Sequence, residues 1–141
     1  HALPDVALID MGDFAGGMLK YLKTHPVPVI TVGGGFAKMT KLGQGLLDLH
    51  SRRGEVDLSY LSQRVRDAGG DEDFAKTMRD ANTAHEVMTE CQKRGIDIGR
   101  LVANDAWTTA AKALGGSGSL LDIVIVDRAG QVIARTEPRK V

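Results

Sequence analysis

Several kinds of residue are scarce in this chain, and each scarcity excludes a class of protein. Cys91 is the single cysteine among 141 residues, so an internal disulfide and a cysteine-rich metal site are both excluded. Aromatic residues make up 4% of the chain and leave little for base stacking. The 18 basic side chains balance 18 acidic ones, so no net charge attracts nucleic acid or an anionic membrane. No apolar run approaches the roughly 20 residues of a membrane span, and no secretory signal opens the chain.

The remaining composition is that of a globular cytoplasmic domain. Apolar residues make up 43% of the chain and charged residues 26%. A chain of this length fits one domain with a sizeable core. Because the chain does not begin with methionine, we expect residues 1–141 to form a single α/β domain at the C-terminus of a longer protein. Since H-E-x-x-H and paired cysteines are absent, no metal site is expected.

The order of apolar runs predicts an α/β fold with a small, mostly parallel sheet, flanking helices and a C-terminal β-hairpin. Short apolar runs at 5–9 and 29–32 flank a helical segment, and a unit of this size makes a right-handed parallel crossover. Near the C-terminus, two apolar runs flank the turn "DRAG" and predict the hairpin. Helices are expected over residues 14–25, 37–49, 58–68, 71–95 and 98–114.

The first glycine-rich loop, "DMGDFAGG", follows the apolar run 5–9. In an open α/β sheet, ligands bind beyond the carboxyl ends of the parallel strands. A strand that ends in an acid, then a glycine turn and a helix, is the usual outline of a site for nucleoside groups or anions. The alternative is structural: Gly12 would serve the turn, while Gly16 and Gly17 would let the helix pack closely on the sheet.

The second glycine-rich stretch, "TVGGGFAKMTK", predicts an anion site in a loop after the strand at 29–32. Three glycines can expose successive N–H groups, and lysines on the following helix add positive charge. Each residue alone has a simpler explanation, as a lysine on a solvated face or a cation at a helix C-terminus. As a cluster they favour an anionic ligand, because three glycines in a row cost folding entropy. The cluster comprises Gly33, Gly34, Gly35, Lys38, Lys41, His50, Arg52 and Arg53.

Four stretches resemble, in chain order, the C-terminal half of the CbiD family, the cobalt-precorrin-5B methyltransferases of cobalamin biosynthesis. They are "GDFAGGMLKYL", "TVGGGFAKMTKLGQGLLDLHS", "ANTAHEV" and "DIVIVDRAGQVIA". The resemblance extends from about Asp5 to Ala134, and the second stretch is its most specific part. The family is understood to methylate carbon C-1 of a ring-contracted cobalt corrinoid with S-adenosylmethionine as donor, next to a partner enzyme of the pathway.

This resemblance implies roles for both glycine-rich stretches. The substrate is a macrocycle fringed with carboxylates, which Gly33, Gly34, Gly35, Lys38, Lys41, Arg52 and Arg53 would bind. The cofactor S-adenosylmethionine would contact Asp10, Gly12, Asp13 and Gly16. His50 is the candidate catalytic base, needed only if the methylated carbon must lose a proton.

Full-length members of the family carry an N-terminal portion that this chain lacks, so these residues could bind without catalysing. The alternative function is a non-catalytic α/β module that binds a nucleotide or an anionic metabolite, or mediates assembly.

Overall fold

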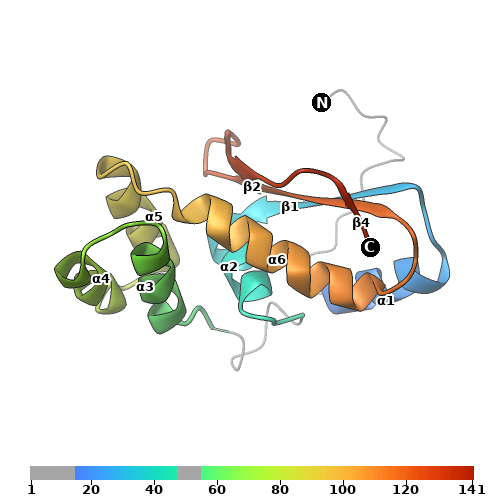
Figure 1. The fold of residues 1–141 in the computed structure, drawn as a ribbon, viewed down its shortest axis with the longest axis horizontal. Helices are drawn as coiled ribbons and strands as arrows, with labels where there is room; N and C mark the ends of the chain where they lie inside the picture. The colour runs from blue at the N-terminus through green and yellow to red at the C-terminus, as the bar shows by residue number, and fades with distance from the viewer. Residues whose placement is uncertain (1–14, 48–54) are drawn as a thin grey trace.

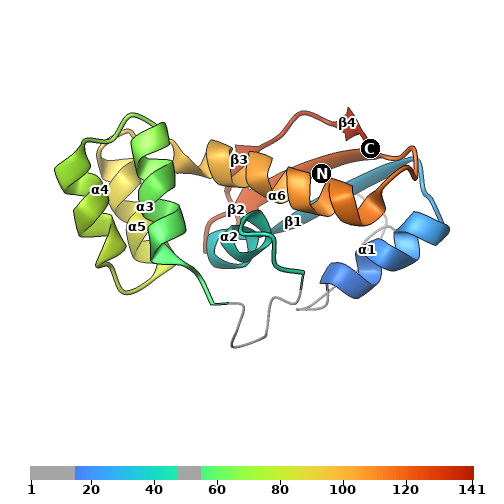
Figure 2. The ribbon, with the colours of Figure 1, turned by 60° about the horizontal axis from the view of Figure 1, so that its bottom comes forward.

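The structure is a computed structural model that describes residues 15–47 and 55–141 (Figure 1). Within these residues, a sheet carries helices on one face, and a lobe of three further helices lies at one end (Figures 1 and 2). The elements are α1 (Ala15–Thr24), β1 (Val29–Gly35), α2 (Phe36–Gly43), α3 (Leu58–Asp67), α4 (Glu72–Arg79), α5 (Ala84–Lys93), α6 (Ile98–Leu114), β2 (Leu120–Val126), β3 (Val132–Arg135) and β4 (Arg139–Lys140).

The two longest described strands, β1 and β2, pair in parallel over their full length. Val29 lies opposite Leu120, and Gly35 lies opposite Val126. The chain then turns back, and β3 and β4 both pair antiparallel with β2, because a short connection permits only that direction. The α/β fold and the C-terminal hairpin are confirmed. The parallel partner of β1 is β2, whereas we expected a parallel unit of the runs 5–9 and 29–32, and that pairing is not tested. The sheet is mixed among the described strands where we expected a mostly parallel one, and the expected strand at 5–9 lies outside the described residues.

Helices cover one face of this sheet. Helices α1, α2 and α6 lie on the same side of β1 and β2 (Figures 1 and 2). The buried side chains of β1, Ile30 and Val32, alternate with exposed positions, as the two-residue period of a strand requires. The opposite face of β1 and β2 carries no helix among the residues that the structure describes. We call it the open face; its β1 side is formed by Val29, Thr31, Gly33 and Gly35.

Helix α2 is shorter than expected. We predicted a helix over 37–49, but α2 ends at Gly43. Gly45 has φ of 94°, its N–H donates to Leu42 O, and the N–H of Leu46 donates to Lys41 O. This pattern is a Schellman motif, which closes a helix with a left-handed glycine. Leu46 and Leu47 therefore do not continue the lysine-bearing face of α2.

The expected helix at 71–95 is two helices, α4 and α5. Thr83 caps α5 by accepting a hydrogen bond from the N–H of Glu86, whose carboxylate accepts from the N–H of Asn82. The sequence "TAHE" is the signature of such a capping box, and it outweighs the helical spacing of the apolar residues on either side. The helix that we predicted over 98–114 is confirmed as α6, with Asp97 as its N-cap.

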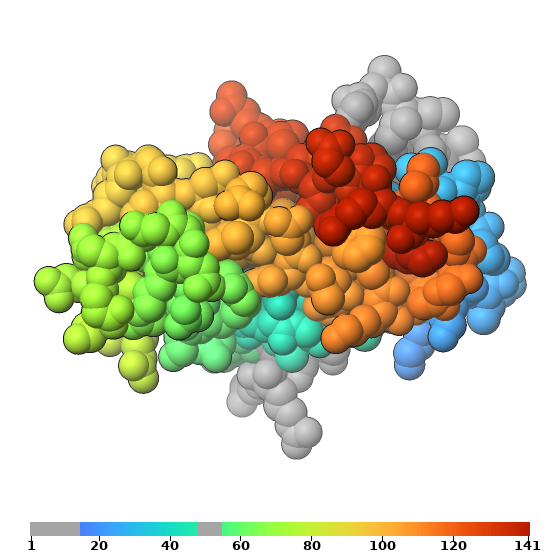
Figure 3. Space-filling view, viewed as in Figure 1, coloured from blue at the N-terminus to red at the C-terminus, as the bar shows by residue number. Residues whose placement is uncertain are grey.

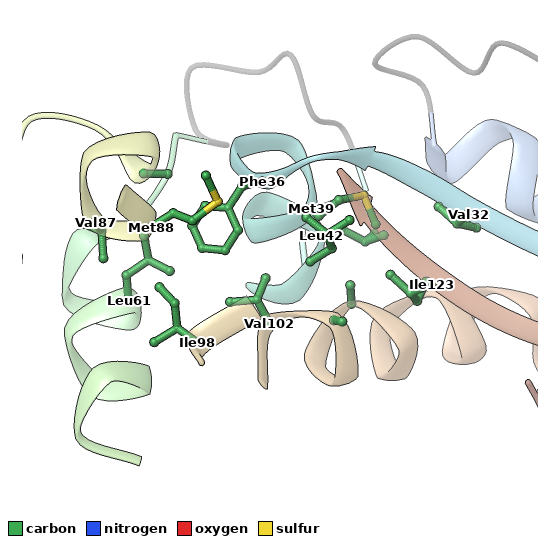
Figure 4. Packing of buried hydrophobic residues seen from close by; sticks show 14 of the residues in the cluster. Val32, Phe36, Met39, Leu42, Leu61, Val87, Met88, Ile98, Val102 and Ile123 are labelled. Atoms are coloured by element: carbon green, nitrogen blue, oxygen red, sulfur yellow. The ribbon is translucent and has the colours of Figure 1, made fainter. Parts of the chain in front are cut away.

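A single hydrophobic core joins the sheet to the helical lobe (Figure 4). Ile123 of β2 and Met39 of α2 pack at the sheet end of this core, and Val102 of α6 continues it. Leu61 and Val87 close it inside the lobe, and both are fully buried. The space-filling view shows the lobe and the sheet layer in continuous contact along α6 (Figure 3). The carboxyl ends of β1 and β2 lie at the end of the sheet nearer the lobe (Figure 1).

Candidate functional site

The carboxyl ends of β1 and β2 meet where Gly35 lies opposite Val126. Helix α2 begins directly after Gly35, which caps it without a side-chain hydrogen bond. The start of α6 lies beside β3 on the same side of the sheet. The two elements are so close that, if Gly99 of α6 carried a Cβ atom, that atom would lie 3.2 Å from Ala134 Cβ of β3. This is the edge at which open α/β sheets bind ligands.

The three consecutive glycines lie in β1 and not in a loop. Gly33, Gly34 and Gly35 pair with Val124, Ile125 and Val126 of β2. Our expectation of successive N–H groups around one anion is therefore wrong, because neighbouring amides of an extended strand point in opposite directions. The strand continues through the glycines because β2, far away in the sequence, supplies a partner for each of them.

The glycines differ in what surrounds them. A Cβ atom on Gly34 would lie 3.1 Å from Met39 Sδ, so this glycine makes room for a core side chain. At Gly35, nothing among the described residues lies within 4 Å of such an atom, and at Gly33 the nearest atom is 3.7 Å away. Gly33 and Gly35 are also exposed. They leave bare backbone on the open face, where a ligand or another chain segment can approach closely.

The two lysines of the predicted cluster lie on α2. Lys38 is exposed in its first turn, and Lys41 is half-buried in its last turn. The buried side of the same helix carries Phe36, Met39 and Leu42. The structure therefore places one cation next to the strand end and the second about one turn further along the helix.

Gly16 is the one predicted cofactor residue within the described part of the chain, and it is closely packed. Its N–H donates to Leu47 O at 3.1 Å, and a Cβ atom on it would lie 2.9 Å from Leu47 Cβ. Gly16 is thus a packing glycine, although it packs against the segment after α2 and not against the sheet as the structural alternative had it. The other predicted site residues lie outside the described residues: Asp10, Gly12, Asp13, His50, Arg52 and Arg53.

A polar network on the open face was not anticipated from the sequence. Asp122 of β2 accepts hydrogen bonds from Thr31 of β1 and Arg135 of β3. We had treated the residue only as part of a buried strand. The signal that could have found it is a single acid inside the apolar run "LLDIVIV", because an acid buried in a strand needs a partner.

A second polar cluster joins α3 to α6. The hydroxyl of Tyr60 donates to Asp105 Oδ2 at 2.5 Å, and Arg64 Nε lies 2.8 Å from the same oxygen. Burial, followed by the hydrogen bond to Asp105, raises the pKa of the Tyr60 hydroxyl. A Cβ atom on Gly43 of α2 would lie 2.8 Å from that hydroxyl oxygen, so three helices meet here. The cluster is a packing contact between α2, α3 and α6.

A pocket of about 270 Å³ lies between the end of α5, the start of α6 and β3. Its lining is mostly apolar and includes Met88, Ile96, Ile98 and Ile133. Residues 15–47 and 55–141 contain no group of three or more His, Cys, Asp or Glu side chains that could hold a metal ion. No helix in the described part of the chain is long and apolar enough to cross a membrane.

The fold and the site together define an α/β domain in which a glycine-rich strand end leads directly into a lysine-bearing helix. A family model described as "CbiD, C-terminal domain" matches residues 48–137. The chain belongs to the CbiD family.

Curated relatives carry the same name in several bacteria. The chain is 56% identical over 135 residues to the cobalt-precorrin-5B C(1)-methyltransferase of Bradyrhizobium sp. (strain BTAi1), 51% over 136 residues to that of Agrobacterium fabrum, and 47% over 135 residues to that of Halorhodospira halophila. Each match covers 96% of this chain but 36% of the relative. The chain thus spans little more than a third of their length. No solved structure matches it.

Proposed function

We propose that this chain is the C-terminal part of a cobalt-precorrin-5B C(1)-methyltransferase and that it provides part of the surface that binds the cobalt-precorrin. The names of the relatives support the activity. The observation that carries the proposed surface is the carboxyl end of β1, where exposed glycines lead directly into α2.

A precorrin is a macrocycle with carboxylate side chains, and the strand end offers two kinds of contact for them. The exposed backbone at Gly33 and Gly35 allows close approach, since no side chain intervenes. The N-terminus of α2 and the ammonium group of Lys38 favour negative charge at the same end of the helix. We therefore assign Gly33, Gly35, Lys38 and Lys41 to substrate binding.

The methyl donor of such an enzyme would be S-adenosylmethionine. Gly16 does not offer its backbone to the donor, because Leu47 occupies both its N–H and the space above it. A donor site in this chain would therefore depend on Asp10, Gly12 and Asp13. We keep His50 as the proposed catalytic base, and Arg52 and Arg53 as proposed contacts for the substrate carboxylates.

The contribution of these residues is binding and positioning. Methyl transfer depends mainly on holding the two reacting atoms in line, which binding groups remote from the reaction can provide. Because the chain covers 36% of its relatives, we expect full activity only from a longer chain. A partner enzyme of the same pathway would act next to it.

The test is to incubate the complete protein that carries this sequence with S-adenosylmethionine and cobalt-precorrin-5B, and to follow the product by mass spectrometry. The expected result is the addition of one methyl group at C-1. If the substrate returns unchanged while the protein is folded, the proposed activity is wrong. Binding of the corrinoid without methylation would instead favour the second candidate, a non-catalytic binding module.

A further inference from the structure

Strand β2 carries apolar side chains on both faces of the sheet. Its sequence, "LLDIVIV", holds six apolar residues and one acid. The residues that face the helices are fully buried: Leu121, Ile123 and Ile125. The apolar residues that alternate with them lie on the open face: Leu120, Val124 and Val126. A nearly continuous apolar run is typical of a strand in a parallel pair that is covered on both faces. Among the described residues, helices cover only one face of β2 (Figures 1 and 2).

The amino ends of β1 and β2 expose apolar side chains that are held in place. Val29 and Leu120 lie opposite each other and are 57% and 40% exposed, and Val27 is 39% exposed. Ser119 Oγ donates to Val27 O at 2.5 Å, and the N–H of Leu120 donates to Pro28 O at 2.9 Å. Ordered apolar side chains of this kind are stabilised when another surface removes them from water. We call Val27, Val29 and Leu120 the apolar end of the open face.

The longer protein supplies a surface for this end. The chain spans 36% of the relative from Bradyrhizobium sp., so nearly two thirds of that protein lie outside the matched part. A portion of the same polypeptide is tethered, and its effective concentration is on the order of millimolar, which favours it over a separate partner. A second layer on the uncovered face of a parallel pair is also how α/β sheets are ordinarily completed.

We propose that the apolar end of the open face is the interface at which the rest of the complete protein packs against this domain. This inference rests on the proposed function, because it takes the chain to be the C-terminal part of a longer methyltransferase. Gly33 lies four residues further along β1 than Val29, or about 13 Å at 3.3 Å per residue. The substrate surface at Gly33 and Gly35 therefore lies beside the interface, where the second portion of the protein can complete it.

The first experiment measures how fast a maleimide labels single cysteines in the complete protein, with any cysteine outside these 141 residues replaced by serine. Val29→Cys should label at least about tenfold more slowly than Thr77→Cys, each rate being divided by its rate in denaturant. Thr77 is the matched control, because it is also β-branched and exposed but lies on α4 in the lobe. Cys91 is buried and does not compete for the reagent. Equal rates for the two variants would overturn the inference.

A second measurement identifies what covers the apolar end and does not depend on a cysteine variant. Photo-leucine, which replaces leucine with a diazirine of similar size, is incorporated into the complete protein, and cross-links from Leu120 are mapped by mass spectrometry. They should reach residues outside these 141. Cross-links that stay within the 141 residues would overturn the inference. So would cross-links between the light and heavy copies of an isotopically mixed sample, which would show a second copy of the protein on this face.

The macrocycle is the remaining occupant, and its presence would show as protection of Val29→Cys that appears only when a corrinoid is added. That result would also overturn the inference. A complete protein that packs on this face but does not methylate cobalt-precorrin-5B would contradict the proposed activity alone. A protein that methylates but leaves Val29→Cys as reactive as Thr77→Cys would contradict the interface alone.

Discussion

The N–H of Gly16 donates a hydrogen bond to the carbonyl oxygen of Leu47 at 3.1 Å. This contact brings the start of α1 next to the segment that follows α2. Gly16, from the first glycine-rich stretch, thus lies against Leu47, six residues beyond the end of the second one. It also explains why residue 16 has no side chain.

Gly16→Val should destabilise the fold, because even its Cβ atom would lie 2.9 Å from Leu47 Cβ. Overpacking of this kind costs about 1–3 kcal/mol. The control is Gly17→Ala in the same helix, where nothing among the described residues lies within 4 Å of a Cβ atom. This change should stabilise α1 by about 0.5–1 kcal/mol. Urea unfolding measures both, and equal effects would contradict the packing explanation.

Gly33→Ala should separate ligand binding from stability. A Cβ atom at this position meets its nearest described neighbour at 3.7 Å, which is ordinary contact, so the free energy of unfolding should change by less than about 0.5 kcal/mol. Binding of a polycarboxylate corrinoid should nevertheless weaken, because the methyl group stands between ligand and backbone. Gly34→Ala is the comparison, since its Cβ atom would press on Met39. Unchanged corrinoid affinity in Gly33→Ala would remove this glycine from the site.

Lys38→Gln and Lys41→Gln test the cationic part of the strand end. A lysine–carboxylate hydrogen bond that is partly desolvated contributes about 1.5–3 kcal/mol, so each change should weaken corrinoid binding about ten- to a hundredfold at low salt. The difference from wild type should shrink as salt rises, because ions screen exposed charges. Lys76→Gln, on the exposed side of α4, is the control. If all four proteins bind equally at low salt, the lysines are only a solvated helix face.

Tyr60→Phe should destabilise the contact between α3 and α6. It removes the hydroxyl that donates to Asp105 and leaves that carboxylate with one fewer partner, a loss of about 1–2 kcal/mol. Tyr21→Phe is the matched control, since Tyr21 is 57% exposed, and it should change stability by less than about 0.5 kcal/mol. Thermal unfolding at neutral pH compares the two, and similar melting temperatures would argue against the cluster as a stabilising contact.

Cys91 should be unreactive in the folded protein. Burial raises the pKa of its thiol to about 11, above the ordinary value of 9.0, so little thiolate forms at neutral pH. Because the folded state keeps the proton longer than the unfolded state, this group's contribution to stability is complete below pH 9 and is lost as pH rises toward 11. The measurement is iodoacetamide labelling with and without denaturant at pH 8. Rapid labelling of the native protein would contradict the buried position.

Local patterns in the sequence were sufficient for much of the secondary structure. We predicted N-caps at Asp57 and Asp97, a turn at 127–130 and strands at 29–32 and 120–127. The structure has both caps, the turn, and strands β1 and β2, with β1 three residues longer than expected. Each depends on neighbours within a few residues, as when the carboxylate of Asp57 accepts from the N–H of Ser59. The capping box at Thr83 is equally local, but the helical spacing of the apolar residues around it led us to predict one continuous helix over 71–95.

The candidate site depended on contacts that no local pattern contains. Three consecutive glycines are typical of a loop, yet residues 33–35 form part of a strand because β2 pairs with them. In the sequence, Asp122 is one acid among apolar residues, and its hydrogen-bond partners cannot be inferred from its neighbours. They are Thr31, 91 positions earlier, and Arg135 on the returning strand. The sequence determined which segments form helices and strands, since propensity, capping and apolar spacing act locally. Only the tertiary structure decided which glycines are packed and which are bare, because strand pairing and burial join residues that are far apart along the chain.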